Sequence, residues 1–179
     1  MDSGSLTVLV EAALGRSWGR DSSWHGEEHW RCVAATGLAL AENLPSADRE
    51  LVLCFGLLHD TRRENEWSDP EHGLRAERFA NELRDEGLLA LGDRRFALLA
   101  TALRLHADGH VADDETTGAC WDADRLHLPR VGIDPDPARL STKVARGPVP
   151  LAAAAALRSA GAPGWTAHVT RVCSTTSAP

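Results

Sequence analysis

Histidine and aspartate side chains lie at the ends of the apolar faces that this sequence forms at helical spacing. The chain contains eight histidines and no tyrosine. A single histidine on an apolar face is usually a hydrogen-bonded core residue, but here the arrangement recurs on five separate segments. Burying an aspartate beside a histidine is costly unless another group compensates it. These polar residues are His29, His59, Asp60, His72, His106 and Asp124.

A divalent cation held by imidazoles and carboxylates would compensate all of these groups together. Mixed nitrogen and oxygen ligands suit Mn, Fe, Ni, Co or Zn, and the sequence does not select among them. We therefore expect a transition-metal site.

The elements that must position these residues are helices. The apolar run Leu51–Leu58 is compatible with a buried helix or with a buried strand, because periodicity alone does not distinguish the two. We interpret it as a helix because the sequence offers no second strand candidate to pair with it. We expect an all-α protein, with one compact domain over residues 1–145 and an extension over 146–179 that holds one short Ala-rich helix and a loosely ordered tail. The other helices are expected over residues 6–14, 26–42, 121–128 and 151–157, with two more beginning near residues 69 and 93.

A few residues also indicate where helices begin and where loops lie. Ser46, with Glu50 nearby, is a plausible start for the helix that carries the apolar run. Residues 109–118 are expected to form an acidic loop, and the SAGAPGW and STTSAP stretches near the end of the chain are expected to be loose.

The composition is that of an ordinary globular domain. The chain has 179 residues, 43% of them hydrophobic and 25% charged, and its formal net charge is -7. An acidic surface argues against binding long nucleic acid, whereas a small phosphorylated substrate can still find positive charge at a metal ion. No apolar run is long enough to span a membrane, and no basic segment precedes the first apolar stretch, so we expect a cytoplasmic protein.

The spacing of these residues resembles a known signature. His29, the doublet His59-Asp60 and Asp124 in the string DADRLH resemble the H…HD…D pattern of the HD-domain superfamily, over roughly residues 24–132. Members are all-helical, metal-dependent phosphohydrolases, and the resemblance implies that these four residues bind the metal. The string ADRLH is similar to one in domains that hydrolyse guanosine tetraphosphate, which favours Asp124 over Asp122 as the last ligand.

Two further histidines match branches of the superfamily that bind two metals. His72, in DPEHG, and His106, in LRLHADGH, follow the doublet in the matching order, so the resemblance leaves open a second metal ion beside the first. The GYP motif of the cyclic-di-GMP branch is absent, and TRRENE replaces the Glu-Asp pair of the guanosine-tetraphosphate hydrolases. Neither of those two substrates is therefore supported.

The resemblance also implies roles around the metal. Asp60 is the candidate for bridging two ions and for accepting a proton from water. Arg62 and Arg63 follow directly, and a guanidinium at either position would clamp phosphate oxygens, unless the two are solvated or paired with the neighbouring glutamates.

Five other residues have both a functional and a purely structural interpretation. His25 either orients a ligand or is a loop residue, and Glu71 either orders its neighbour His72 or favours the helix dipole by its charge. His110 closes the pocket or belongs to a solvated loop. Trp24 and Trp67, expected in loops, either stack on a base or belong to the core.

The function expected from this pattern is metal-dependent hydrolysis of a phosphoester in a small nucleotide or another phosphorylated metabolite. One alternative is a non-catalytic, metal-binding regulatory module, which the complete H…HD…D set disfavours. Another is a di-iron oxygenase of HD type.

Overall fold

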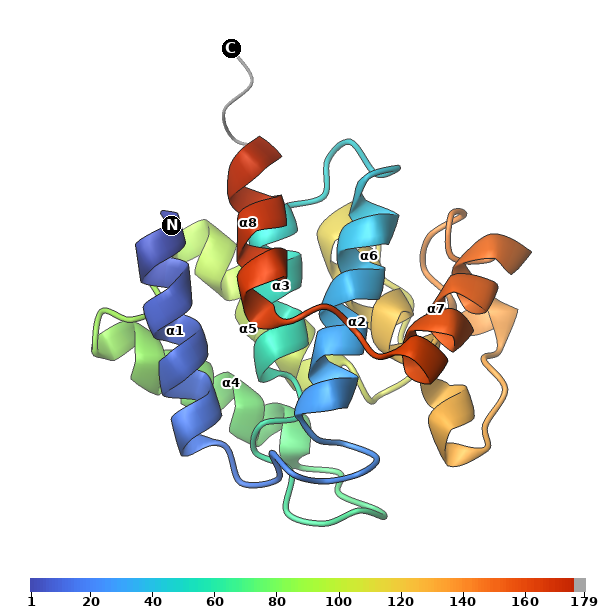
Figure 1. The fold of residues 1–179 in the computed structure, drawn as a ribbon, viewed down its shortest axis with the longest axis horizontal. Coiled ribbons are helices and arrows are strands. Elements are labelled where there is room, and N and C mark those ends of the chain that lie inside the picture. The colour runs from blue at the N-terminus through green and yellow to red at the C-terminus, as the bar shows by residue number, and fades with distance from the viewer. Residues whose placement is uncertain (176–179) are drawn as a thin grey trace.

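The computed structural model describes residues 1–175 as eight α-helices and two short 3-10 helices, with no strand among them (Figure 1). The all-α prediction is confirmed for this part of the chain. The end of the expected loose tail, residues 176–179, lies outside the described residues. None of the described helices is long and apolar enough to cross a membrane.

Two central helices form the middle of the bundle. Helices α2 (Glu27–Ala41) and α3 (Arg49–Leu58) pack directly against each other, and every residue from Leu51 to Leu58 is buried. The apolar run is therefore a helix, surrounded on all sides. Its N-cap is Asp48, whose carboxylate accepts hydrogen bonds from the backbone of the first turn. The start signal proposed at Ser46 was wrong by two residues.

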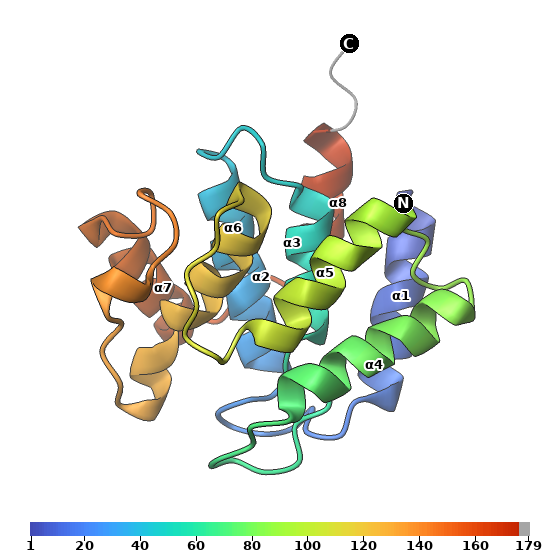
Figure 2. The ribbon, with the colours of Figure 1, turned by 180° about the vertical axis from the view of Figure 1, so that it is seen from behind.

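Helices α4 (His72–Asp85) and α5 (Asp93–Leu105) pack on one another and lie in front of the central pair in Figure 2. They approach closely at Gly73, where an added Cβ would lie 2.6 Å from the carbonyl oxygen of Arg104. The absence of a side chain at Gly73 thus brings the start of α4 against the end of α5.

Helix α6 (Glu115–Arg125) packs against α2 and α3 and begins earlier than expected. The side chain of Asp114 caps it by accepting from the Thr117 amide, so part of the expected acidic loop is helical. The helix ends at Arg125, and the 3-10 turn Leu128–Val131 follows, with Pro129 in its first turn.

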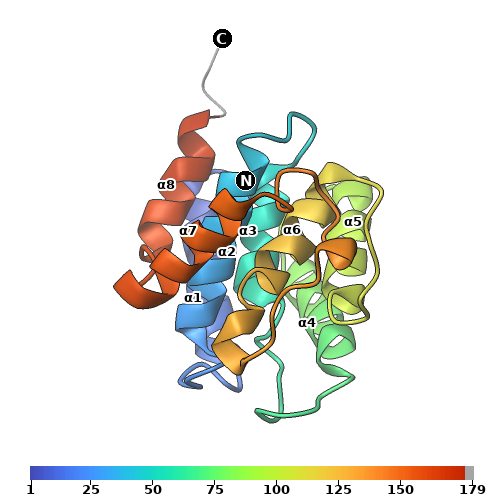
Figure 3. The same ribbon diagram turned by 90° about the vertical axis from the view of Figure 1, so that its right-hand side faces the viewer.

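The C-terminal segment contains two helices where one was expected. Helix α7 (Pro148–Ala160) packs on α2, and α8 (Trp165–Thr175) packs on α1 (Ser3–Arg16) and α3. Figure 3 shows α7 and α8 on one side of the bundle and α4 and α5 on the other. Helix α8 was not expected from the sequence; buried side chains at helical spacing attach it to the core. These are Trp165, His168, Val169 and Val172.

Candidate metal centre

The six expected metal ligands converge at one end of the bundle in two groups. His29 on α2, His59 at the end of α3 and Asp124 on α6 form the first group. Asp60, directly after α3, joins the first residue of α4 and the residue that ends α5 in the second. Within each group the potential ligand atoms lie within 4.8 Å of one another. The second group consists of Asp60, His72 and His106.

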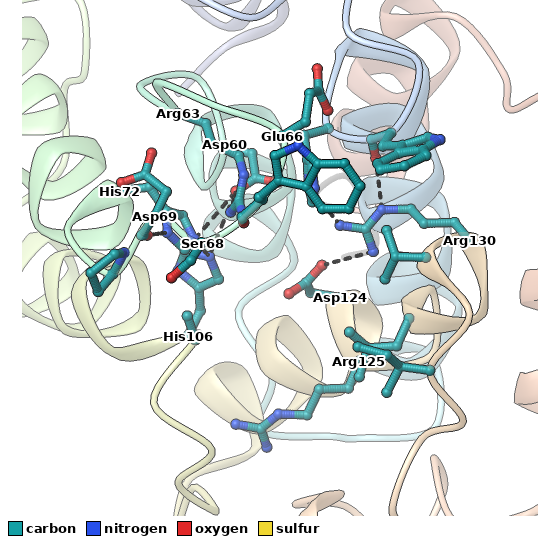
Figure 4. Close-up of a pocket in the computed structure, with 18 of the residues that line it drawn as sticks. Asp60, Arg63, Glu66, Ser68, Asp69, His72, His106, Asp124, Arg125 and Arg130 are labelled. Atoms are coloured by element: carbon teal, nitrogen blue, oxygen red, sulfur yellow. Dashed lines mark hydrogen bonds and ion pairs between the residues drawn. The ribbon is translucent and has the colours of Figure 1, made fainter.

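Asp60 lies between the two groups and faces both. Its Oδ2 is 3.7 Å from Nε2 of His29 and 3.7 Å from Nε2 of His59. Its Oδ1 is 3.4 Å from Nε2 of His72 and 3.9 Å from Nε2 of His106. Figure 4 shows Asp60, His72 and His106 together on one side of the pocket and Asp124 on the other. A single carboxylate thus offers one oxygen to each group.

Three of the histidine rings are oriented by the backbone. In each, Nδ1 contacts the carbonyl oxygen of the residue three positions earlier, at 3.2 Å for His59 and 2.8 Å for His106. His72 makes the same contact with Asp69. Since a carbonyl only accepts, Nδ1 carries the proton and Nε2 presents a lone pair to the centre, which is the arrangement of a metal-ligating imidazole.

The resulting Nε2 atoms face one another in pairs. They are 3.2 Å apart between His59 and His29 and 2.8 Å apart between His72 and His106. Between His72 and His106 both nitrogens present lone pairs, which repel each other unless a cation or a proton lies beside them. Buried Oδ1 atoms of Asp60 and Asp124 also lack hydrogen-bond partners. The donor set therefore fits a pair of divalent cations, whose binding would satisfy these atoms.

Charge states in the cluster also fit metal binding. Burial lowers the pKa of His29 well below its usual value, and the charge of Arg130 adds to this effect. Burial and a neighbouring histidine likewise lower the pKa of His72 and of His106. These imidazoles are therefore neutral at pH 7 and able to ligate.

The two carboxylates of the cluster are ionised. Burial acts to raise the pKa of Asp60, but the neighbouring His59 and the hydrogen bond with His25 hold that pKa well below its usual value. At Asp124 burial is likewise outweighed, chiefly by the adjacent His29 imidazole, whose Nε2 lies 3.2 Å from Oδ1.

The alternative ligand Asp122 has a structural role. Its side chain is fully buried and belongs to neither ligand group. Oδ1 accepts from the Ser141 amide at 2.6 Å, and Oδ2 accepts from the Thr142 amide at 2.8 Å. Asp122 thus ties the segment after the 3-10 turns to α6, and Asp124 is the residue that the structure places in the cluster.

Only one of the two adjacent arginines reaches the cluster. Arg63 Nη1 lies 3.6 Å from Oδ1 of Asp60. The guanidinium of Arg62 lies 3.8 Å from the ring centroid of Phe79 and 3.6 Å from Glu82. The structure therefore does not support a phosphate-clamping role for Arg62, because its charged group covers an aromatic ring on α4.

Of the other residues expected near the metal, one reaches the cluster and two do not. Nδ1 of the buried His25 lies 3.2 Å from Oδ2 of Asp60, so His25 contacts a ligand. The carboxylate of Glu71 is exposed and 4.0 Å from Arg75, and the carbonyl of Asp69 orients His72 instead. His110 is exposed and does not line the pocket, so the structure places neither Glu71 nor His110 at the centre.

Arg130 is a residue of the centre that the sequence did not indicate. Its Nη1 lies 3.9 Å from Oδ1 of Asp124, and its Nη2 lies 3.1 Å from Nδ1 of His25. Its Nε donates to the Trp24 carbonyl at 2.7 Å. Arg130 lies in the 3-10 turn after α6, where no periodic pattern marks a buried face; its position six residues after Asp124 is the only available signal.

The cluster opens into a cavity of about 700 Å³. Its lining carries ligand side chains, four arginines and the further acidic residues Glu66, Asp69 and Asp136, so any positive charge that an anion meets there comes from individual guanidinium groups and not from a basic surface. The basic lining residues are Arg63, Arg125, Arg130 and Arg139.

Comparison of the chain with protein-family models, with curated proteins and with solved structures gives no match.

Proposed function

We propose that this protein is a metal-dependent phosphohydrolase of HD type that uses two divalent transition-metal ions to cleave a phosphoester in a small substrate. The observation that carries the proposal is the position of Asp60, with one carboxylate oxygen toward each histidine group. The H…HD…D order of the ligands supports the assignment to the HD superfamily.

The residues divide between two ions. His29, His59 and Asp124 would hold one ion, and His72 and His106 would hold the other, with Asp60 shared between them. Bound ions of this kind polarise a phosphoryl oxygen and lower the pKa of a water molecule.

The charged groups around the two ions would position the ligands and bind the phosphate. The low pKa of Asp60 makes its carboxylate a fixed negative charge rather than the proton acceptor expected from the sequence, and His25, 3.2 Å from its Oδ2, holds that carboxylate in place. Arg63 and Arg130 contribute fixed positive charge beside the two carboxylates, at 3.6 and 3.9 Å. A guanidinium in such a position binds phosphate oxygens through paired N–H groups.

The size and charge of the chain favour a small substrate. A cavity of about 700 Å³ falls within the range of small-molecule sites. With a net charge of -7 the protein lacks the basic surface that long nucleic acids require.

The test combines metal analysis with a substrate screen. The purified protein is assayed for phosphate release from phosphomonoesters, nucleotides and cyclic nucleotides with Mn, Ni, Co, Fe or Mg added. Asp60→Asn keeps the shape of the side chain but removes the bridging charge, and should abolish turnover. Asp85→Asn, at the exposed end of α4, is the matched control and should retain it.

Other results of this screen would refute the proposal. Phosphate release that never exceeds the Asp60→Asn background would refute the hydrolase. Iron-dependent oxygen consumption would then favour the oxygenase, and metal binding without either reaction would favour a regulatory module.

A further inference from the structure

Two exposed tryptophans belong to the same cavity as the ligand cluster. Trp24 is in the loop before α2 and Trp67 in the loop before α4, and their side chains are 39% and 77% exposed. The ring centroids are 5.5 Å apart with the planes nearly perpendicular, at 88°. Because an edge-to-face pair covers only part of each ring, most of the aromatic surface of Trp67 stays open to a ligand.

The arginines beside the cluster also hold the loops that carry this pair. Arg130 Nε donates to the Trp24 carbonyl at 2.7 Å, and Arg63 Nη2 donates to the Trp67 carbonyl at 2.8 Å. The same two guanidinium groups lie within 4 Å of the ligand carboxylates of Asp124 and Asp60. The aromatic pair is thereby fixed relative to the metal ligands.

The rest of the cavity suits a substrate with two unlike parts. One part of the lining is polar and formed by the metal ligands and arginines. Leu128, Val131 and Ile133 add apolar surface to the same cavity, and Ile133 is 53% exposed. A volume of about 700 Å³ is ample for a ligand that combines a phosphate with a flat ring system.

We propose that Trp24 and Trp67 form a recognition subsite for a planar aromatic ring, so that the substrate is a phosphate monoester carrying such a ring, as nucleoside monophosphates do. This inference rests on the proposed phosphohydrolase function for the phosphate end of the substrate. Base stacking on aromatic side chains depends on the π-face rather than on base identity, so the subsite selects for a ring and not for a particular base.

The test compares two ligands that differ only in the ring. Binding to the protein in manganese-containing buffer is measured calorimetrically for the phosphonate isosteres of adenosine monophosphate and ribose 5-phosphate. A methylene group replaces the ester oxygen in both, so neither ligand turns over. The adenosine ligand should bind about 5- to 150-fold more tightly, which is the worth of one stacked base.

Variants assign the preference to the tryptophans. Trp67→Ala should remove most of the preference, and Trp67→Phe should retain much of it. Trp18→Ala is the matched control, because Trp18 is 55% exposed but does not line this cavity. Circular dichroism verifies that each variant remains folded, as expected for exposed positions.

Equal affinity for the two ligands, no binding of either, or a preference unchanged in Trp67→Ala would overturn the inference. A tryptophan-dependent preference without phosphate release from nucleotides would retain the ring subsite and refute the hydrolase. Equal turnover of adenosine monophosphate and ribose 5-phosphate, with equal binding of their isosteres, would retain the hydrolase and refute the subsite.

Discussion

Gly73→Ala should disrupt the second ligand group and spare the first. An alanine Cβ at this position would lie 2.6 Å from the Arg104 carbonyl oxygen and 2.8 Å from that of Leu103. The Leu103 carbonyl is the group that orients His106, through its contact with Nδ1 at 2.8 Å. Any relief of the clash therefore moves His106 relative to His72 on the facing helix.

The magnitude follows from the packing. The shorter contact is about 0.8 Å inside ordinary van der Waals distance, and both atoms struck belong to backbone, which cannot rotate away. Overpacking of this kind costs about 1–3 kcal/mol of unfolding free energy. Displacing a group that orients a ligand lowers metal affinity roughly 10- to 100-fold, here for the ion held by Asp60, His72 and His106.

The assay is a calorimetric manganese titration, with urea unfolding of the metal-free protein. Wild type should bind two ions per chain, and Gly73→Ala should bind one with unchanged affinity and a second weakly. Gly15→Ala, where an added Cβ meets no atom within 4 Å, is the control and should match wild type. Two ions bound at wild-type affinity by Gly73→Ala would refute this account of the second group.

Three further results are expected. Asp122→Ala should lower the unfolding free energy by about 3 kcal/mol in urea unfolding, because two buried backbone N–H groups lose a charged acceptor, yet leave the metal content unchanged; loss of metal would contradict its structural role. Burial, together with nearby arginine charges, lowers the pKa of His168 to about 4. As the pH falls, His168 is therefore protonated in the unfolded chain before it is protonated in the folded protein. The free energy of unfolding should therefore fall as the pH drops from about 6.5 to 4, by up to about 1.4 kcal/mol per pH unit, and should fall less steeply in His168→Leu. Parallel plots of unfolding free energy against pH for the two proteins would refute this. Arg63→Ala should lower kcat/KM for phosphate release roughly 10- to 100-fold, whereas Arg62→Ala should stay near wild type; equal effects would contradict the different orientations of the two side chains.

The ligand cluster was predictable because helix faces and metal ligands leave strong local patterns. His29 and His59-Asp60 each mark the end of an apolar helix face, and the helix around Asp124 places that residue and Asp122 on different sides. At the level of sequence the resemblance and the helix face of Asp124 both favoured Asp124, although Asp122 shares a face with Leu126. In the structure Asp124 lies in the cluster, whereas backbone amides occupy both carboxylate oxygens of Asp122.

Residues outside regular helices were not predictable in the same way. Arg62 and Arg63 follow the end of α3 in a turn, where neighbouring side chains diverge without a fixed period. Arg130 reaches the cluster from a 3-10 turn whose path depends on tertiary packing. Helix α8 is a different case, because Trp165, His168, Val169 and Val172 have helical spacing, a signal that the adjoining Pro163-Gly164 obscured.

Anomalous scattering from crystals grown with manganese tests the central claim most directly. The account predicts two peaks, one within bonding distance of His29, His59 and Asp124 and one within bonding distance of His72 and His106, with Asp60 contacting both. A single peak under excess manganese, or two peaks that do not share Asp60, would contradict it.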